Sequence, residues 1–170
     1  MQIIASLLPG KFQAEGIGVA KASILAGFID ASRFLAFLLM AGTAWWHGRK
    51  IPLSLVSVFL SAGFCICMFG SGIALIAAGE IVYGISAGFA YYSALYYAMV
   101  LSKASVGAGG SHESVIGGGF TAGPLLALGG KQMALLLGVS AAGGLIFGVV
   151  PMILTAVPLS ILYLMPKKQS

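Results

Sequence analysis

The sequence predicts an all-α protein, a polytopic bundle of transmembrane helices. Of its 170 residues, 59% are hydrophobic and only 8% are charged, and the mean hydropathy is +1.04. In an ordinary soluble domain about 25% of the residues are charged. The composition therefore predicts an integral membrane protein and excludes an ordinary soluble enzyme or binding domain.

Five apolar stretches are long enough to cross a bilayer, because a helix rises about 1.5 Å per residue and the hydrocarbon core is roughly 30 Å thick. We place these spans near residues 22–46, 51–70, 72–101, 111–130 and 143–165. Residues 131–142 are apolar but short. They lie in the interface, extend the last span or, less readily, help to form a sixth crossing.

The N-terminal segment precedes the first span. Residues 1–8 are apolar but too short to cross, and Leu8-Pro9 followed by Gly10 predicts the end of a helix and then a loop. We therefore expect residues 1–20 to be the remnant of a preceding helix and an outer loop, and residues 21–170 to be the helical bundle. On this interpretation the chain starts inside a longer helix and is a fragment or a truncated product.

Basic residues predict the orientation. The net charge of +5 comes mostly from loops between spans, where Lys and Arg set topology, so the partner that we expect is the lipid bilayer and no nucleic acid. One side receives Arg49, Lys50, Lys103, Lys167 and Lys168, and the other receives Lys11, Lys21 and Lys131. The richer side is predicted to be the cytoplasm, which gives a multi-pass protein of the inner or plasma membrane with a cytoplasmic C-terminus.

Three charged residues fall inside predicted spans, where each costs about 2.5–3.5 kcal/mol and so requires a reason. Asp30 and Arg33, three residues apart, share a helix face and partly neutralise each other. Glu80 enters its span to a depth similar to that of Asp30, which predicts a shared polar locus. Tyr83 and Tyr91 follow Glu80 at helical spacing. We interpret these five residues as a substrate or proton pathway, with a structural ion-pair cluster as the alternative.

A His112-Glu113 pair stands at the expected cytoplasmic start of the 111–130 span. A carboxylate at a helix N-terminus is favoured by free N–H groups and by the helix dipole, so a helix cap is one interpretation. A cytoplasmic gate or protonation site, using the imidazole, is the other.

Glycines recur at helical spacing in two spans. Gly84 and Gly88, and likewise Gly119 and Gly123, place small residues on one face and allow close helix packing. Pro124 then removes a backbone hydrogen bond and permits a bend, so we predict helix packing and a hinge. A cluster of tyrosines near the inner end of the 72–101 span is better interpreted as an aromatic belt than as a substrate site; it comprises Tyr91, Tyr92, Tyr96 and Tyr97.

No catalytic or metal-binding pattern emerges. Cys65 and Cys67 lie two apart in an apolar run with no His close by, and no second His follows His112 at zinc-protease spacing. A G-x-S-x-G nucleophile motif is absent, and Asp30 is the chain's only Asp. We therefore expect no enzyme, no cofactor and no metal.

The order of these features resembles the C-terminal half of a Major Facilitator Superfamily transporter. Gly48-Arg49-Lys50, in the short inner loop after the first span, is similar to the end of that family's G-x-x-x-D-R-x-G-R-K loop motif. The glycine-proline pattern of the 111–130 span resembles a second motif of the family; its members here are Gly110, Gly119, Gly123 and Pro124. The spans then correspond to the family's helices eight to twelve, preceded by the end of helix seven.

The resemblance implies a function. In that family two lobes enclose a midplane cavity and rock about it, giving alternating access. We therefore predict transport of a small solute by a secondary transporter or permease, with the N-terminal lobe supplied by a missing part or by a second chain. The alternative is a non-transporting membrane subunit or scaffold that docks a partner through its glycine-rich faces.

Overall fold

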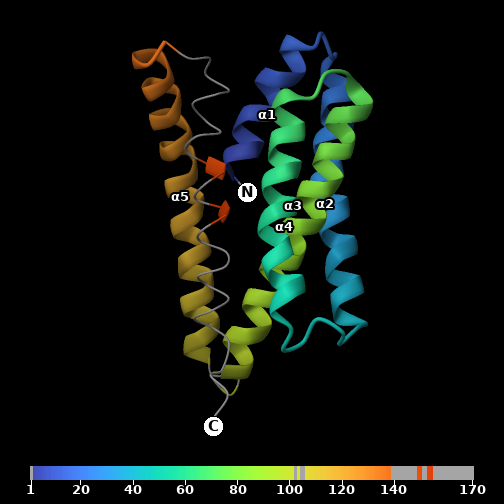
Figure 1. The fold of residues 1–170 in the computed structure, drawn as a ribbon, viewed down its shortest axis with the longest axis vertical. Coiled ribbons are helices and arrows are strands. Elements are labelled where there is room, and N and C mark those ends of the chain that lie inside the picture. The colour runs from blue at the N-terminus through green and yellow to red at the C-terminus, as the bar shows by residue number, and fades with distance from the viewer. Residues whose placement is uncertain (1, 102, 104–105, 139–148, 151–152, 155–170) are drawn as a thin grey trace.

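A computed structural model describes residues 2–101, 103, 106–138, 149–150 and 153–154 (Figure 1). These residues form helices and no strand, which confirms the all-α prediction. The helices, in chain order, are α1 (Gln2–Ala14), α2 (Val19–Ala41), α3 (Lys50–Phe69), α4 (Ile73–Leu101) and α5 (Val106–Leu136).

Within the described residues, three helical segments are long and apolar enough to cross a membrane: Val19–Ala41, Ile51–Phe69 and Ile73–Val100. They belong to α2, α3 and α4, which stand side by side and alternate in direction (Figure 1). The chain is therefore a membrane protein by the length and composition of these helices.

Helix α4 is central to this group, and glycines bring its neighbours close. On the α3 side, Gly79 lies against Cys67. On the α2 side, Gly84 lies against Ile29, and a Cβ atom placed on Gly88 would be 2.8 Å from the Arg33 carbonyl oxygen. Lipid supplies no hydrophobic drive between helices, so close backbone contact of this kind stabilises the bundle by van der Waals packing.

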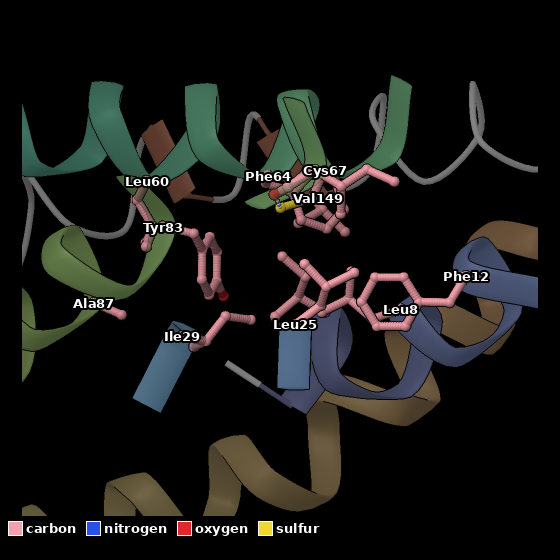
Figure 2. Close-up of a cluster of buried hydrophobic side chains, with 12 residues drawn as sticks. Leu8, Phe12, Leu25, Ile29, Leu60, Phe64, Cys67, Tyr83, Ala87 and Val149 are labelled. Carbon is pink, nitrogen blue, oxygen red and sulfur yellow. Dashed lines mark hydrogen bonds between the residues drawn. The ribbon is translucent and has the colours of Figure 1, made fainter. Parts of the chain in front are cut away.

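The main apolar core lies among α1, α2, α3 and α4. Figure 2 shows the ring of Tyr83 between Leu60 of α3 and Ile29 of α2, while Leu8 and Phe12 reach the same core from α1. Its buried members are Ile4, Leu8, Phe12, Leu25, Ile29, Leu60, Phe64, Cys67, Ile76, Tyr83, Ala87 and Val149. Helix α1 is thus packed as a full member of this core.

Helix α5 stands apart from the α2–α4 group. In the described chain its contacts are with α1 and with α4 (Figure 1). Most of its large apolar side chains are exposed, among them Phe120, Leu125, Leu126, Leu128, Leu135 and Leu136. Within the described part of the chain, this apolar surface is left uncovered.

Several predicted boundaries are wrong. Helix α1 does not end at Leu8 but continues through Pro9 to Ala14. Proline removes only one helical hydrogen bond, and burial of Leu8 and Phe12 on either side of it keeps the helix intact. Helix α2 ends at Ala41, short of the expected residue 46.

Helix α5 is longer than expected at both ends. It starts at Val106, because a helix satisfies its backbone hydrogen bonds internally and so runs through Gly107–Gly110 in an apolar setting. At its other end it takes in residues 131–136, so this part of the ambiguous segment extends the fourth predicted span. The predicted span 143–165 lies outside the described residues, apart from 149–150 and 153–154.

Candidate functional site

An ion pair lies halfway along α2. Arg33 Nη2 donates to Asp30 Oδ1 at 2.6 Å, as their three-residue spacing allows. Asp30 lies eleven residues after Val19, about 16 Å along the helix, which places it near the bilayer midplane. The Asp30 side chain is 70% exposed and that of Arg33 is 31% exposed, so the carboxylate is the more accessible partner.

These two side chains line a cavity of about 770 Å³ between α1, α2 and α5, which we call the α1–α2–α5 cavity. Its walls are mainly apolar and include Ile4, Leu8, Phe12, Ala22, Ala26, Ile29 and Phe120. Its polar members, besides Asp30 and Arg33, are Gln13 and Ser23. A mostly apolar cavity of roughly 300–1,000 Å³ with a few polar groups is the usual form of a small-molecule site.

A second polar contact joins α4 to α5 beside this cavity. The Tyr91 hydroxyl donates to Glu113 Oε1 at 3.2 Å, and the Tyr91 ring lies 5.6 Å from that of Phe37. Phe37 follows Arg33 by about one turn on α2, so Tyr91 lies close to the level of Arg33. Three residues of the predicted pathway, Asp30, Arg33 and Tyr91, therefore share one face of the bundle with Glu113.

The helix-cap interpretation of Glu113 is wrong. Glu113 lies seven residues after Val106, past the first turn of α5, where no N–H group is left free for it. Its partner is the Tyr91 hydroxyl. The interpretation of His112 as a gate remains a prediction, because its side chain lies outside the described part of the chain.

Glu80 lies elsewhere, in the closed core. It is 0% exposed, and neither carboxylate oxygen has a hydrogen-bond partner among the described residues. On its own helix it is part of a buried stripe with Ile76, Tyr83 and Ala87. Gly84, one turn after Glu80 on α4, lies level with Ile29 of α2. Glu80 is therefore about one helical turn away from the level of Asp30. Among the described residues no hydrogen bond or ion pair joins the two acids, so the predicted shared locus is divided between the cavity and the core.

The sequence matches no protein-family model, and no curated protein or solved structure is significantly similar to it. A functional assignment therefore depends on the geometry of the chain itself. The described residues contain no group of three or more His, Cys, Asp or Glu side chains that could hold a metal ion.

An aromatic cluster, larger than the predicted group of tyrosines, holds the loop between α2 and α3. Trp46 is fully buried and its indole N–H donates to the Thr43 carbonyl at 3.0 Å, whereas neighbouring Trp45 is exposed. The His47 ring stacks on Tyr96 with centroids 4.3 Å apart. The sequence signal was present in the Trp45-Trp46-His47 run, opposite the tyrosines of α4.

The same cluster positions the predicted loop motif. The Gly48 N–H donates to the Tyr97 hydroxyl at 2.8 Å, and Gly48 has a φ of +70°, which favours glycine. Arg49, which follows, is exposed. Lys50 is the first residue of α3. The tyrosines therefore fix the loop that presents these basic residues.

The predicted packing glycines have contrasting surroundings. Gly84 and Gly88 lie against α2 inside the bundle, whereas no other described atom lies within 4 Å of a Cβ placed on Gly119. Gly123 is buried, and Pro124 lies inside α5 without ending it.

A polar contact at the opposite end of the bundle was also not predicted. Glu15 accepts from Lys11 Nζ at 2.9 Å and from the Gly72 N–H at 3.0 Å, which ties the end of α1 to the turn between α3 and α4. The Gly72 and Lys11 hydrogen bonds lower the pKa of Glu15 below its usual value. Glu15 lies outside the three candidate membrane-spanning helices, so this link belongs to the turns at their ends.

Proposed function

We propose that the chain forms one lobe of a membrane transporter for small solutes, which works by alternating access together with a second lobe or chain. The observation that carries the proposal is the α1–α2–α5 cavity, lined by the Asp30–Arg33 pair halfway along an apolar helix. Ionisable groups at this depth are costly and usually belong to substrate or ion pathways. The resemblance to the C-terminal half of a Major Facilitator Superfamily protein gives this lobe a place in a known transport architecture.

The walls of the cavity differ in a way that suits transport. The α2 wall belongs to the tightly packed group, whereas the α5 wall contributes Phe120 from a helix with exposed apolar side chains. Pro124 lies one turn beyond Phe120 and removes a hydrogen bond from the helix. Movement of α5 about this point would change access to Asp30 while the α2–α4 group stays fixed.

Uptake measurements test this proposal. Membrane vesicles from cells expressing the chain with its second lobe or partner are screened with radiolabelled solutes. The Asp30→Asn variant should reduce uptake at least about tenfold, since a charge-assisted contact contributes roughly 1.5–3 kcal/mol. Glu15→Gln is the matched control, because Glu15 is an acid outside the spans. Uptake that is unchanged in Asp30→Asn would remove the cavity from the mechanism.

A second candidate, a subunit or scaffold that docks a partner, is favoured by the open glycines of α5. Nothing in the described chain lies within 4 Å of a Cβ placed on Gly117, Gly118 or Gly119. Crosslinking separates the two functions. Gly119→Leu would abolish a crosslinked partner if α5 is a docking face, and uptake in the same cells would then be absent from wild type as well.

A further inference from the structure

We propose that the α1–α2–α5 cavity binds an organic cation with apolar arms, such as a hydrophobic amine or a quaternary ammonium or phosphonium ion. The inference depends on the proposed function in one respect: it names the solute class of the same cavity. Three properties of the cavity support it, namely the accessible charge, the apolar walls and the scarcity of free hydrogen-bonding groups.

The accessible charge is negative. Asp30 is more than twice as exposed as Arg33, and the guanidinium that neutralises it is directed to one carboxylate oxygen, Oδ1. A cation is the ligand that this accessible carboxylate complements.

The apolar walls favour a ligand with hydrocarbon arms. Leu8 and Phe12 of α1, Ile29 of α2 and Phe120 of α5 all belong to the lining. Burying apolar area contributes about 25 cal/mol per Å². Phe120, whose side chain is exposed, also adds an aromatic ring, and aromatic rings attract cations.

A sugar or another polyol is disfavoured by the polar groups that remain. The Ser23 hydroxyl already donates to the Val19 carbonyl at 3.0 Å within its own helix. Gln13 is the single amide side chain of the described lining. A ligand with many hydroxyls would leave most of them without partners, at a cost of about 1–3 kcal/mol for each.

Equilibrium binding of a matched pair of ions tests the inference. The full chain in lipid nanodiscs is titrated with radiolabelled tetraphenylphosphonium and, separately, with tetraphenylborate, which has the same phenyl arms and the opposite charge. We expect saturable binding of the phosphonium ion that is displaced by unlabelled phosphonium and not by the borate. Equal binding of the two ions, or saturable binding of the borate alone, would overturn the inference.

One variant that removes a negative charge and one that removes a positive charge should have opposite effects on binding, which excludes a folding artefact. Asp30→Asn should weaken phosphonium binding roughly tenfold or more, while Asp30→Glu should retain most of it. Arg33→Gln should strengthen binding, because it removes the competing positive charge, and a misfolded variant would not do so. Loss of binding in Arg33→Gln to the same degree as in Asp30→Asn would contradict the assignment.

The outcome is separable from that of the proposed function. Phosphonium binding by a chain that supports no uptake would refute transport and retain the cation site. Uptake that depends on Asp30 and is selective for anions or polyols would retain transport and refute the cation site.

Discussion

Glycine has opposite surroundings in α4 and in α5. In α4, Gly79 lies against Cys67 of α3, and Gly84 and Gly88 lie against α2. A neighbouring helix thus occupies the space that the side chain of a larger residue would need. In α5, Gly117, Gly118 and Gly119 have open space among the described residues. The α2–α4 group is thus a closed unit, whereas these glycines of α5 are covered by no other described residue. A small-x-x-x-small pattern therefore predicts the capacity for close packing and not the partner.

Adding one methyl group in each region tests the contrast most strongly. Gly84→Ala would push a Cβ onto Ser32 Oγ and the Ile29 carbonyl, so we expect it to destabilise the protein by about 1–3 kcal/mol. Gly118→Ala, the matched control, should be neutral or stabilising by up to about 1 kcal/mol, because alanine is the better helix former. Unfolding in mixed micelles with increasing sodium dodecyl sulfate measures both. Equal losses at the two sites would mean that α5 is as tightly packed as α4.

Replacing Glu80 tests whether this buried carboxyl group lowers the stability of the α2–α4 group. Glu80→Met fills a similar volume and removes two buried oxygens that have no hydrogen-bond partner in the described chain. We expect a gain of about 1–3 kcal/mol in the same unfolding assay. Glu113→Met, which breaks the Tyr91 hydrogen bond on an exposed residue, is the control and should give no gain. Destabilisation by Glu80→Met would show that Glu80 has a structural partner.

The loop between α2 and α3 offers a smaller test of the closed unit. Tyr97→Phe removes the acceptor of the Gly48 N–H, and we expect a loss of about 0.5–1.5 kcal/mol. Tyr96→Phe is the comparison, because its hydroxyl is 3.5 Å from His47 Nδ1, a longer contact, and its ring stacking is kept. The Tyr97 variant should therefore lose more stability than the Tyr96 variant in the unfolding assay, and the reverse order would contradict the assigned loop anchor.

The turn between α3 and α4, which Glu15 contacts, gives the smallest expected effect. Since hydrogen bonds from Gly72 and Lys11 lower the pKa of Glu15 in the folded chain, its contribution is fully present above the unfolded pKa of about 4.3. That contribution is lost as the pH falls through the lower folded pKa. Unfolding midpoints should therefore fall more steeply below about pH 4 in wild type than in Glu15→Gln. Identical pH profiles would show that the link between α1 and the α3–α4 turn contributes nothing.

Composition and hydropathy were sufficient to predict an all-helical membrane protein and to locate α3 and α4 within one residue at each end. Rules based on neighbouring residues failed where tertiary packing determines the ends of a helix. Pro9 does not stop α1, because Leu8 and Phe12 are buried on either side of it. The glycine run before Ser111 does not delay α5.

The candidate site was predicted only in part. The Asp30–Arg33 pair follows from three-residue spacing on one helix, which is a local property. The separation of Glu80 from Asp30 depends on which face of α4 meets α2, and depth along a helix carries no information on rotation about its axis. The pairing of Tyr91 with Glu113 joins α4 to α5 and required the tertiary arrangement.

On this account the mainly apolar α1–α2–α5 cavity, which contains Asp30 and Arg33, reaches the middle of α2 from the aqueous phase. Two alanines of that helix test it: Ala26 lines the α1–α2–α5 cavity, while Ala31 lies on the exposed apolar face of α2 with Phe28 and Leu35. In a chain with Cys65 and Cys67 replaced by alanine, Ala26→Cys and Ala31→Cys are each treated in native membranes with a charged, membrane-impermeant maleimide. We predict labelling at residue 26 and none at residue 31. No labelling at residue 26, or equal labelling of both, would contradict an aqueous cavity at this depth.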